Sequence, residues 1–265
     1  MGEAIPNTSL AAWVERIEPH DNYLASRIGG ESMNPYAVAA GFGLPVPAYR
    51  KFDSVESFLG QSDEGLQPLL STGVTSFYVG GRTTAPGLSG FRNNQPLAAK
   101  DIVPFIHGMV APEHRAIYNV RIAEFLQGLC VVAQIRRDGT IELDIGVGTT
   151  LPELTGGRKT PDFIATNERT AENPAGQLRY FAWQGDKSGT EAAVPLAAEV
   201  ETSVLNTSVR TAIWRGISAL PAMTVESDVY VPRLPGRYEF AVVNHNGIDT
   251  AIFGDAQPFR KLSVE

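Results

Sequence analysis

Residues 130–145 read CVVAQIRRDGTIELDI and carry the clearest secondary-structure signal in the chain. An apolar run over residues 130–135 leads into a turn that ends in Asp-Gly, after which residues 140–145 alternate between apolar and polar side chains. A turn of this kind between two runs of strand-forming residues is typical of a β-hairpin. The stretch therefore predicts two antiparallel strands joined by a tight turn.

A second hairpin is predicted near the end of the sequence. YEFAVV at residues 238–243 and TAIF at residues 250–253 flank an Asn-Gly turn at residues 246–247. Between the two hairpins, apolar residues recur at steps of three and four over residues 196–219, which predicts an amphipathic helix with a break near Asn206. Strands and helices in this order predict a mixed α/β (α+β) fold.

Proline and glycine mark the elements of the first third of the chain. Asn34 and Pro35 predict the start of a short helix that closes at Gly41 and Gly43. A further helix is predicted to open at residues 53–56, DSVE. The region is therefore expected to hold two short helices joined by an extended turn.

A glycine-rich loop is predicted to follow a short strand at residues 76–79, SFYV. The loop, residues 80–90, reads GGRTTAPGLSG and offers hydroxyl groups together with the guanidinium of Arg82. A loop of this composition can approach a ligand closely. In the alternative interpretation, its glycines only supply the positive φ angles of an irregular loop.

Charge and composition exclude several classes of protein. The net charge of −7 and the pI near 5.2 repel polyanions, and the densest basic pairs, Arg136-Arg137 and Arg158-Lys159, are too small for a nucleic-acid patch. The sequence shows neither an apolar run of membrane-spanning length nor a signal peptide. We therefore expect a cytoplasmic protein without nucleic-acid or membrane partners, in which Cys130 is a buried, inert thiol.

Familiar catalytic motifs are missing from the sequence. It contains no Gly-x-Ser-x-Gly elbow, no Gly-x-x-x-x-Gly-Lys-Ser/Thr phosphate loop and no Rossmann fingerprint. Its four histidines do not fall at metal-ligand spacings. The remaining candidates are spread along the chain, with Arg82 in the glycine-rich loop and the carboxylates of Glu239 and Asp255 in the last hairpin.

Short segments resemble, in order, the ATP-grasp nucleotide-binding domain that opens pyruvate phosphate dikinase and phosphoenolpyruvate synthase. The family segments concerned are a Gly-Gly-Lys block, Gly-Leu-Pro-Val-Pro, Val-Arg-Ser-Ser, a Gly-x-x-Thr-Pro-Asp ending, Ile-Glu-Trp-Ala and Gln-Ala-Arg-Pro. The similar segments of this chain are IGGES (28–32), GLPVP (43–47), VGGRTT (79–84), GRKTPD (157–162), YEFA (238–241) and DAQP (255–258).

The resemblance implies an ATP-grasp-like fold of two lobes with antiparallel sheets and a cleft. One lobe would comprise residues 1–110 and the other residues 111–265. The cleft would bind ATP and Mg²⁺, with Arg82 on the phosphates and Glu239 and Asp255 as metal ligands. The other residues assigned to cofactor binding are Thr83, Thr84, Arg121, Glu124, Gln134, Lys159 and Gln257.

Each of the three main assignments also has a purely structural interpretation. Glu239 would then be a solvent-facing carboxylate of a strand. Asp255 would be a turn former, and Arg82 a loop cation paired with a nearby acid.

Two departures from the family pattern leave the function open. Glu31 replaces a lysine and Gln257 replaces an arginine, so two cations that would bind phosphate are missing. The first hypothesis is an ATP- and Mg²⁺-dependent kinase or ligase that acts on an unknown small molecule or a separate carrier protein. The second is a pseudoenzyme that serves as a binding or regulatory module. The third is an unrelated mixed α/β fold that binds a small ligand.

Overall fold

The computed structural model describes residues 35–41, 43–83, 85–136, 139–155, 157–168, 177–185, 191–220, 223–224, 230–231 and 236–258 of the 265-residue chain. Two units are present, one over Pro47–Leu126 and the other over the described residues on both sides of it. Each unit has its own antiparallel sheet, which confirms the predicted mixed α/β fold with antiparallel sheets. No helix in the described part of the chain is long and apolar enough to cross a membrane.

The chain divides differently from the predicted single boundary after residue 110. Strand β4 (Asn119–Glu124) pairs with β1 (Tyr49–Phe52) on one side and with β2 (Phe77–Arg82) on the other. Both neighbours precede residue 110, and their hydrogen bonds hold β4 in the same unit. The smaller unit therefore continues to Leu126.

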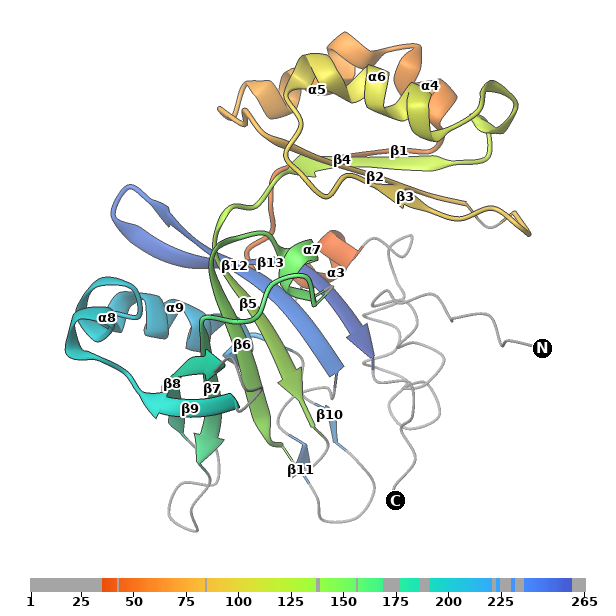
Figure 1. Ribbon diagram of the computed structural model, residues 1–265. Coiled ribbons are helices and arrows are strands. Elements are labelled where there is room, and N and C mark those ends of the chain that lie inside the picture. The colour runs from red at the N-terminus through yellow and green to blue at the C-terminus, as the bar shows by residue number, and fades with distance from the viewer. Residues whose placement is uncertain are drawn as a thin grey trace. The chain divides into compact units, whose positions relative to one another are not determined.

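The smaller unit is a four-stranded antiparallel sheet with its helices on one face (Figure 1). The strand order is β1-β4-β2-β3. The predicted helix start at residues 53–56 is confirmed, because the Ser54 hydroxyl accepts a hydrogen bond from the Ser57 N–H at 2.9 Å. The remaining elements are β3 (Phe91–Arg92), α4 (Val55–Leu59), α5 (Ser62–Leu70), α6 (Ala99–Met109) and the 3-10 helix η2 (Pro112–His114).

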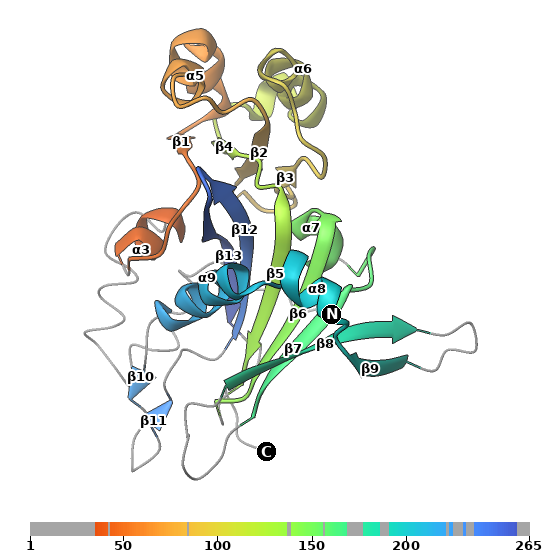
Figure 2. The same ribbon diagram turned by 90° about the vertical axis from the view of Figure 1, so that its left-hand side faces the viewer.

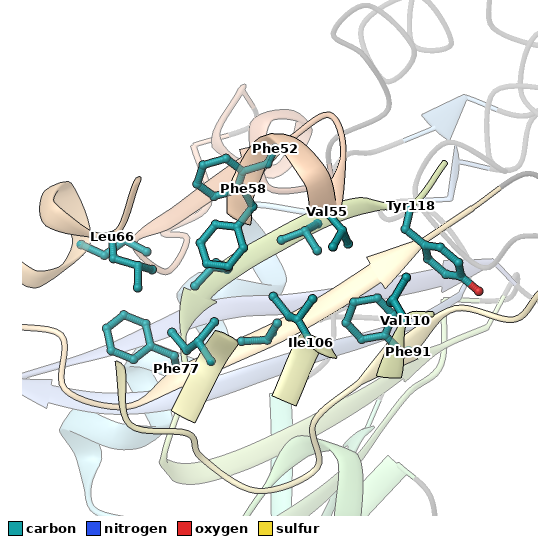
Figure 3. Close-up of a cluster of buried hydrophobic side chains, with 14 of the residues drawn as sticks. Phe52, Val55, Phe58, Leu66, Phe77, Phe91, Ile106, Val110 and Tyr118 are labelled. Carbon is teal, nitrogen blue, oxygen red and sulfur yellow. The ribbon is translucent and has the colours of Figure 1, made fainter. Parts of the chain in front are cut away.

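The core of this unit lies between the sheet and the helices (Figure 3). Phe52 and Phe77 of the strands pack with Phe58 of α4 and Ile106 of α6, and all four are at most 4% exposed. The rings of Phe52 and Phe58 meet edge to face, with centroids 5.0 Å apart. Burial of each such side chain contributes about 1.5–3 kcal/mol. The core residues occupy the face of the sheet that the helices cover. The polar and charged candidate residues Arg82 and Arg121 lie on the opposite face.

The Gly80-Gly81 pair lies inside β2, so the prediction that a loop begins at residue 80 is wrong. A Cβ on Gly81 would overlap the ring of Phe91, which belongs to the core. A Cβ on Gly80 would lie 2.6 Å from Oη of Tyr78. Neighbouring strand positions point to opposite faces. Gly80 therefore makes room for the Tyr78 ring on one face, and Gly81 makes room for the Phe91 ring on the other. Of the four glycines in residues 80–90, only Gly87 has a positive φ, of 78°, so the interpretation that all of them supply positive φ angles is wrong.

The larger unit is built on a seven-stranded antiparallel sheet with the order β13-β12-β5-β6-β7-β8-β9. Helix α9 (Thr207–Ser218) lies along one face of this sheet (Figure 2), where Gly216 closely approaches Phe240 and Ala251. The strands are β5 (Gly128–Ile135), β6 (Ile141–Thr149), β7 (Phe163–Glu168), β8 (Gln177–Gly185), β9 (Glu191–Pro195), β12 (Gly236–His245) and β13 (Ile248–Pro258). The other elements are α3 (Pro35–Gly41), α7 (Leu151–Thr155), α8 (Ala198–Ser203) and the paired strands β10 (Met223–Thr224) and β11 (Tyr230–Val231).

Both predicted hairpins are confirmed. In β5–β6, Gly139 has φ of 80°. Asn167 of β7 fastens this turn, because its Oδ1 accepts from the Ile141 N–H at 2.7 Å and its Nδ2 donates to the Gly139 carbonyl at 3.0 Å. In β12–β13, Asn246 and Gly247 have φ of 52° and 83°, as a type I′ turn requires.

The predicted helix over residues 196–219 is confirmed as two helices, α8 and α9. The break falls at Asn206, whose Oδ1 accepts from the Val209 N–H at 3.0 Å and so caps α9. Helix α3 also ends as predicted, with Gly43 at φ of 79°. The predicted cap at Asn34 lies outside the described residues.

The Gly81→Ala variant should be less stable than the wild type, by about 1–3 kcal/mol, because the new methyl group collides with the Phe91 ring in the core. The matched control is Gly108→Ala in α6, where a Cβ meets nothing within 4 Å. There the same substitution should be neutral or stabilising by up to ~1 kcal/mol. Urea unfolding of both variants provides the measurement, and equal stabilities would contradict this account of β2.

Candidate functional site

Glu239 and Asp255 stand directly opposite each other on the adjacent strands β12 and β13. Residues opposite each other in an antiparallel pair point to the same face, with Cβ atoms roughly 5 Å apart. Glu239 is only 7% exposed, so the interpretation of this residue as a solvent-facing carboxylate is wrong. Asp255 lies within β13 rather than in a turn, and its Oδ1 accepts from the Ala256 N–H at 2.9 Å.

A β-bulge next to this pair sets its geometry. Glu239 pairs with Asp255, whereas the next residue, Phe240, pairs with Phe253, which leaves Gly254 as the extra residue of β13. A Cβ on Gly254 would lie 2.6 Å from Cδ1 of Leu151 and 3.2 Å from the Glu239 carbonyl oxygen. The bulge therefore needs glycine, and it places both carboxylates on one face.

Arg237 is a further charged residue of this face, and no sequence motif singles it out. Its Nη2 lies 3.4 Å from Oε1 of Glu239. In the strand register, Arg237 stands opposite Gln134 on one side and Gln257 on the other. The signal was present in the sequence, because residues 237 and 239 of one strand must share a face. The structure thus brings Gln134, Glu239 and Asp255 together on one sheet face with Arg237, and places the backbone of Gln257 beside them.

Asp144 extends the acidic row across the sheet. Val132 of β5 pairs with Glu239 on one side and with Asp144 of β6 on the other. Burial raises the pKa of Asp144 above its usual 3.8, and the neighbouring Glu142 adds to the rise. Both carboxylate oxygens of Glu142 accept a hydrogen bond, at 2.9 Å, from Nη2 of Arg136. Asp144 is therefore a carboxyl group that the fold holds in an unfavourable setting.

The pKa of the Cys130 thiol on β5 is shifted by burial and by nearby charged residues. Burial, with smaller contributions from Glu239 and Glu153, raises the pKa of its thiol to about 12 against the opposing charge of Lys159. Cys130 is fully buried, which confirms the predicted burial of this thiol. A protonated thiol is a poor nucleophile. Lys159 lies 3.2 Å from Oδ2 of Asp162 and donates to the Val147 carbonyl, so it has local partners.

In the smaller unit, Arg82 and Arg121 lie on the face of the sheet that carries none of the unit's helices. Phe77 and Val79 of β2 point into the core, so Tyr78, Gly80 and Arg82 point the other way. Arg121 of β4 stands opposite Gly80 and shares this helix-free face. Its guanidinium lies 5.4 Å from the centroid of the Tyr78 ring.

The other residues predicted in this unit do not join that group. Glu124 alternates with Val120 and Ile122, both buried, and so falls on the helix-covered face. The Thr83 hydroxyl accepts from the Ala85 N–H at 3.1 Å and shapes the start of the loop. Thr84 lies outside the described residues, as does Glu31. Arg82 belongs to one unit and Glu239 and Asp255 to the other, so their convergence stays a prediction.

The chemistry of the donors allows a magnesium ion only with help from a ligand. Among the described residues, no group of three or more His, Cys, Asp and Glu side chains could hold a metal ion. Mg²⁺, however, is commonly held by one or two carboxylates, with phosphate oxygens and water completing its shell. The Glu239–Asp255 pair fits that second arrangement.

No family model matches the chain, and no curated protein matches it either. Among solved structures, D-alanine–D-alanine ligase from Bacillus anthracis is 14% identical with a TM-score of 0.35, over 84% of this chain and 55% of that one. The ATP-grasp ligase PsnB with its minimal precursor is 14% identical with a TM-score of 0.34, over 90% and 56%. The macrocyclase MdnC with precursor peptide MdnA from Microcystis aeruginosa MRC is 11% identical with a TM-score of 0.35, over 86% and 52%.

The chain spans about half the length of these proteins, since it covers 52–56% of each. At such identities and TM-scores we draw no function from the likeness. The assignment below depends on the residues of this chain.

The Asp144→Asn variant should be more stable than the wild type at neutral pH. Because the folded-state pKa is raised, Asp144 costs no stability below its unfolded value of 3.8 and lowers stability as the pH rises through the folded pKa. The gain from the amide should therefore vanish when the pH falls below 3.8. Urea unfolding across this pH range is the measurement, with Glu199→Gln on the exposed face of α8 as control. A pH-independent difference would contradict the assignment.

Proposed function

We propose that the chain binds ATP together with Mg²⁺ as an ATP-grasp-type phosphotransferase or ligase. The observation that carries the proposal is the register pair of Glu239 and Asp255, with Arg237 two residues away on the same face. A carboxylate that is 7% exposed is costly to ionise unless a cation or a ligand compensates it. Two carboxylates and a guanidinium on one sheet face contribute little to apolar packing, so a binding function explains their presence better.

The carboxylates of the site would bind the metal cation, and the arginines would bind the phosphate anion. Glu239 and Asp255 would hold Mg²⁺, which neutralises the charge that develops on the transferred phosphoryl group. Arg237, and Arg82 from the other unit, would hold phosphate oxygens, because a guanidinium binds them through two parallel N–H groups. Gln134 would contribute to nucleotide binding, as the resemblance to the ATP-grasp domain implies.

Register also bears on the alternative of a pseudoenzyme. That hypothesis depends partly on Gln257, which replaces an arginine of the family pattern. Arg237 stands directly opposite Gln257 on the neighbouring strand, so a positive charge is retained beside this position. This supports an active enzyme over a binding or regulatory module, although the replacement of lysine by Glu31 still favours the module.

The acceptor of the phosphoryl group is proposed only by class. It is either a small molecule or a separate carrier protein. In each case Asp144, on the same face two strands away from Glu239, lies where it could receive or donate a proton.

Calorimetry with ATP, with and without Mg²⁺, tests the proposal. Each of Glu239→Gln and Asp255→Asn should weaken Mg²⁺-dependent ATP binding by at least about tenfold, since a charged contact contributes roughly 1.5–3 kcal/mol. Glu199→Gln, an exposed acid on α8, is the matched control and should bind as the wild type does. Unchanged affinity in both site variants would refute the metal assignment.

Release of ADP separates the two hypotheses of function. An enzyme should release ADP from Mg-ATP in the presence of its acceptor, and slowly with water alone. A protein that binds Mg-ATP tightly and releases no ADP with any acceptor tested would be the regulatory module instead.

A further inference from the structure

A row of three cations crosses the helix-free face of the smaller sheet. Strand register places Lys51 of β1 opposite Arg121 of β4. Arg121 stands opposite Gly80 of β2, which in turn stands opposite Arg92 of β3. Since opposite residues share a face, the row is interrupted only by glycine. Arg82 lies on the same face, two residues beyond Gly80.

The acids of this unit lie elsewhere. Residues 47–126 contain seven Lys and Arg and seven Asp and Glu, so the unit as a whole is neutral. Five of the acids are on helices, Asp53 follows β1, and Glu124 points to the helix-covered side. No acidic residue occupies a described strand position on the helix-free face, where the charged strand residues are all cations.

We propose that Lys51 and Arg92 bind the polyphosphate chain of the nucleotide, together with Arg121 and Arg82. The proposal rests on the nucleotide-binding function above and adds two residues that the sequence motifs do not assign. Neighbouring strands lie about 4.8 Å apart, so the row from Lys51 to Arg92 extends over about 14 Å. A row of several cations with long side chains can contact several phosphate groups at once, whereas a single phosphate would contact only some of them.

Tyr78 fixes the middle of the row. Its ring lies over Gly80, where a Cβ would come within 2.6 Å of Oη, and the guanidinium of Arg121 lies 5.4 Å from the ring centroid. A guanidinium this close to an aromatic ring is attracted to the ring, which restricts where the Arg121 side chain can lie. Glycine at position 80 is therefore what permits this arrangement on the phosphate-binding face.

A nucleotide fits this face better than a nucleic acid does. Four cations offset the negative charge of one nucleoside triphosphate. A long polyanion would extend past them into the field of a protein with a net charge of −7. We therefore assign the face to a free nucleotide, and nucleic-acid binding becomes an outcome of the test.

The test measures binding of ATP, AMP and inorganic tripolyphosphate to the full chain by calorimetry. Lys51→Gln and Arg92→Gln should each weaken ATP and tripolyphosphate binding about tenfold and leave the weak binding of AMP nearly unchanged. Arg50→Gln is the matched control, because Arg50 adjoins Lys51 on β1 but shares the face of Phe52, 6.0 Å from its ring. It should bind all three ligands as the wild type does, and thermal unfolding should show that every variant folds.

The outcomes distinguish this inference from the proposed function. If ATP binds and depends on Glu239 but not on Lys51 or Arg92, the row is overturned and the function stands. If tripolyphosphate binds through Lys51 and Arg92 while ATP gains nothing from Mg²⁺, the row stands and the function fails. If single-stranded oligonucleotides bind more tightly with increasing length and displace ATP, the assignment to a free nucleotide is overturned. Absence of any binding overturns both.

Discussion

The register of β12 against β13 is the constraint on which the candidate site depends. Gly254 adds one residue to β13, and this bulge places Glu239 directly opposite Asp255. A slip of one residue would turn one carboxylate to the opposite face of the sheet, which α9 covers. The register is held on both sides, because Leu151 and the Glu239 carbonyl leave no room for a side chain at position 254. The β-bulge at Gly254 therefore sets the relative position of Glu239 and Asp255, although it contributes no functional group to the site.

The same alternation of side chains produces complementary charge on the two units. In each sheet, one face packs against an apolar core, and the candidate binding residues lie on the other. The larger unit presents Glu239, Asp255 and Asp144 there, with Arg237 among them, whereas the charged residues at the described strand positions of the helix-free face are Lys51, Arg82, Arg92 and Arg121. The net charge of −7 conceals this separation, because the smaller unit is neutral as a whole. A magnesium ion with a polyphosphate requires both kinds of surface.

Local signals in the sequence predict much of the fold, and long-range contacts account for what they miss. The Asn-Gly and Asp-Gly turns and the helix break at Asn206 follow from neighbouring residues, whereas the role of the two acids as metal ligands follows from the family resemblance. The strand position of Gly80 could not be predicted, because the aromatic rings that explain the double glycine come from other positions, one of them on another strand. The membership of β4 in the smaller unit depends on partners about 40–70 residues earlier in the chain. Arg237 was predictable from its spacing to Glu239, whereas the burial of Asp144 was not.

A crystal structure with Mg²⁺ and a non-hydrolysable ATP analogue tests the central claim most directly. The account predicts a metal ion that contacts Glu239 and Asp255 and bridges to phosphate oxygens, with Arg82 and Arg121 on the phosphate chain. An analogue bound with its metal ion remote from these carboxylates, or with its phosphates facing away from both arginines, would contradict it.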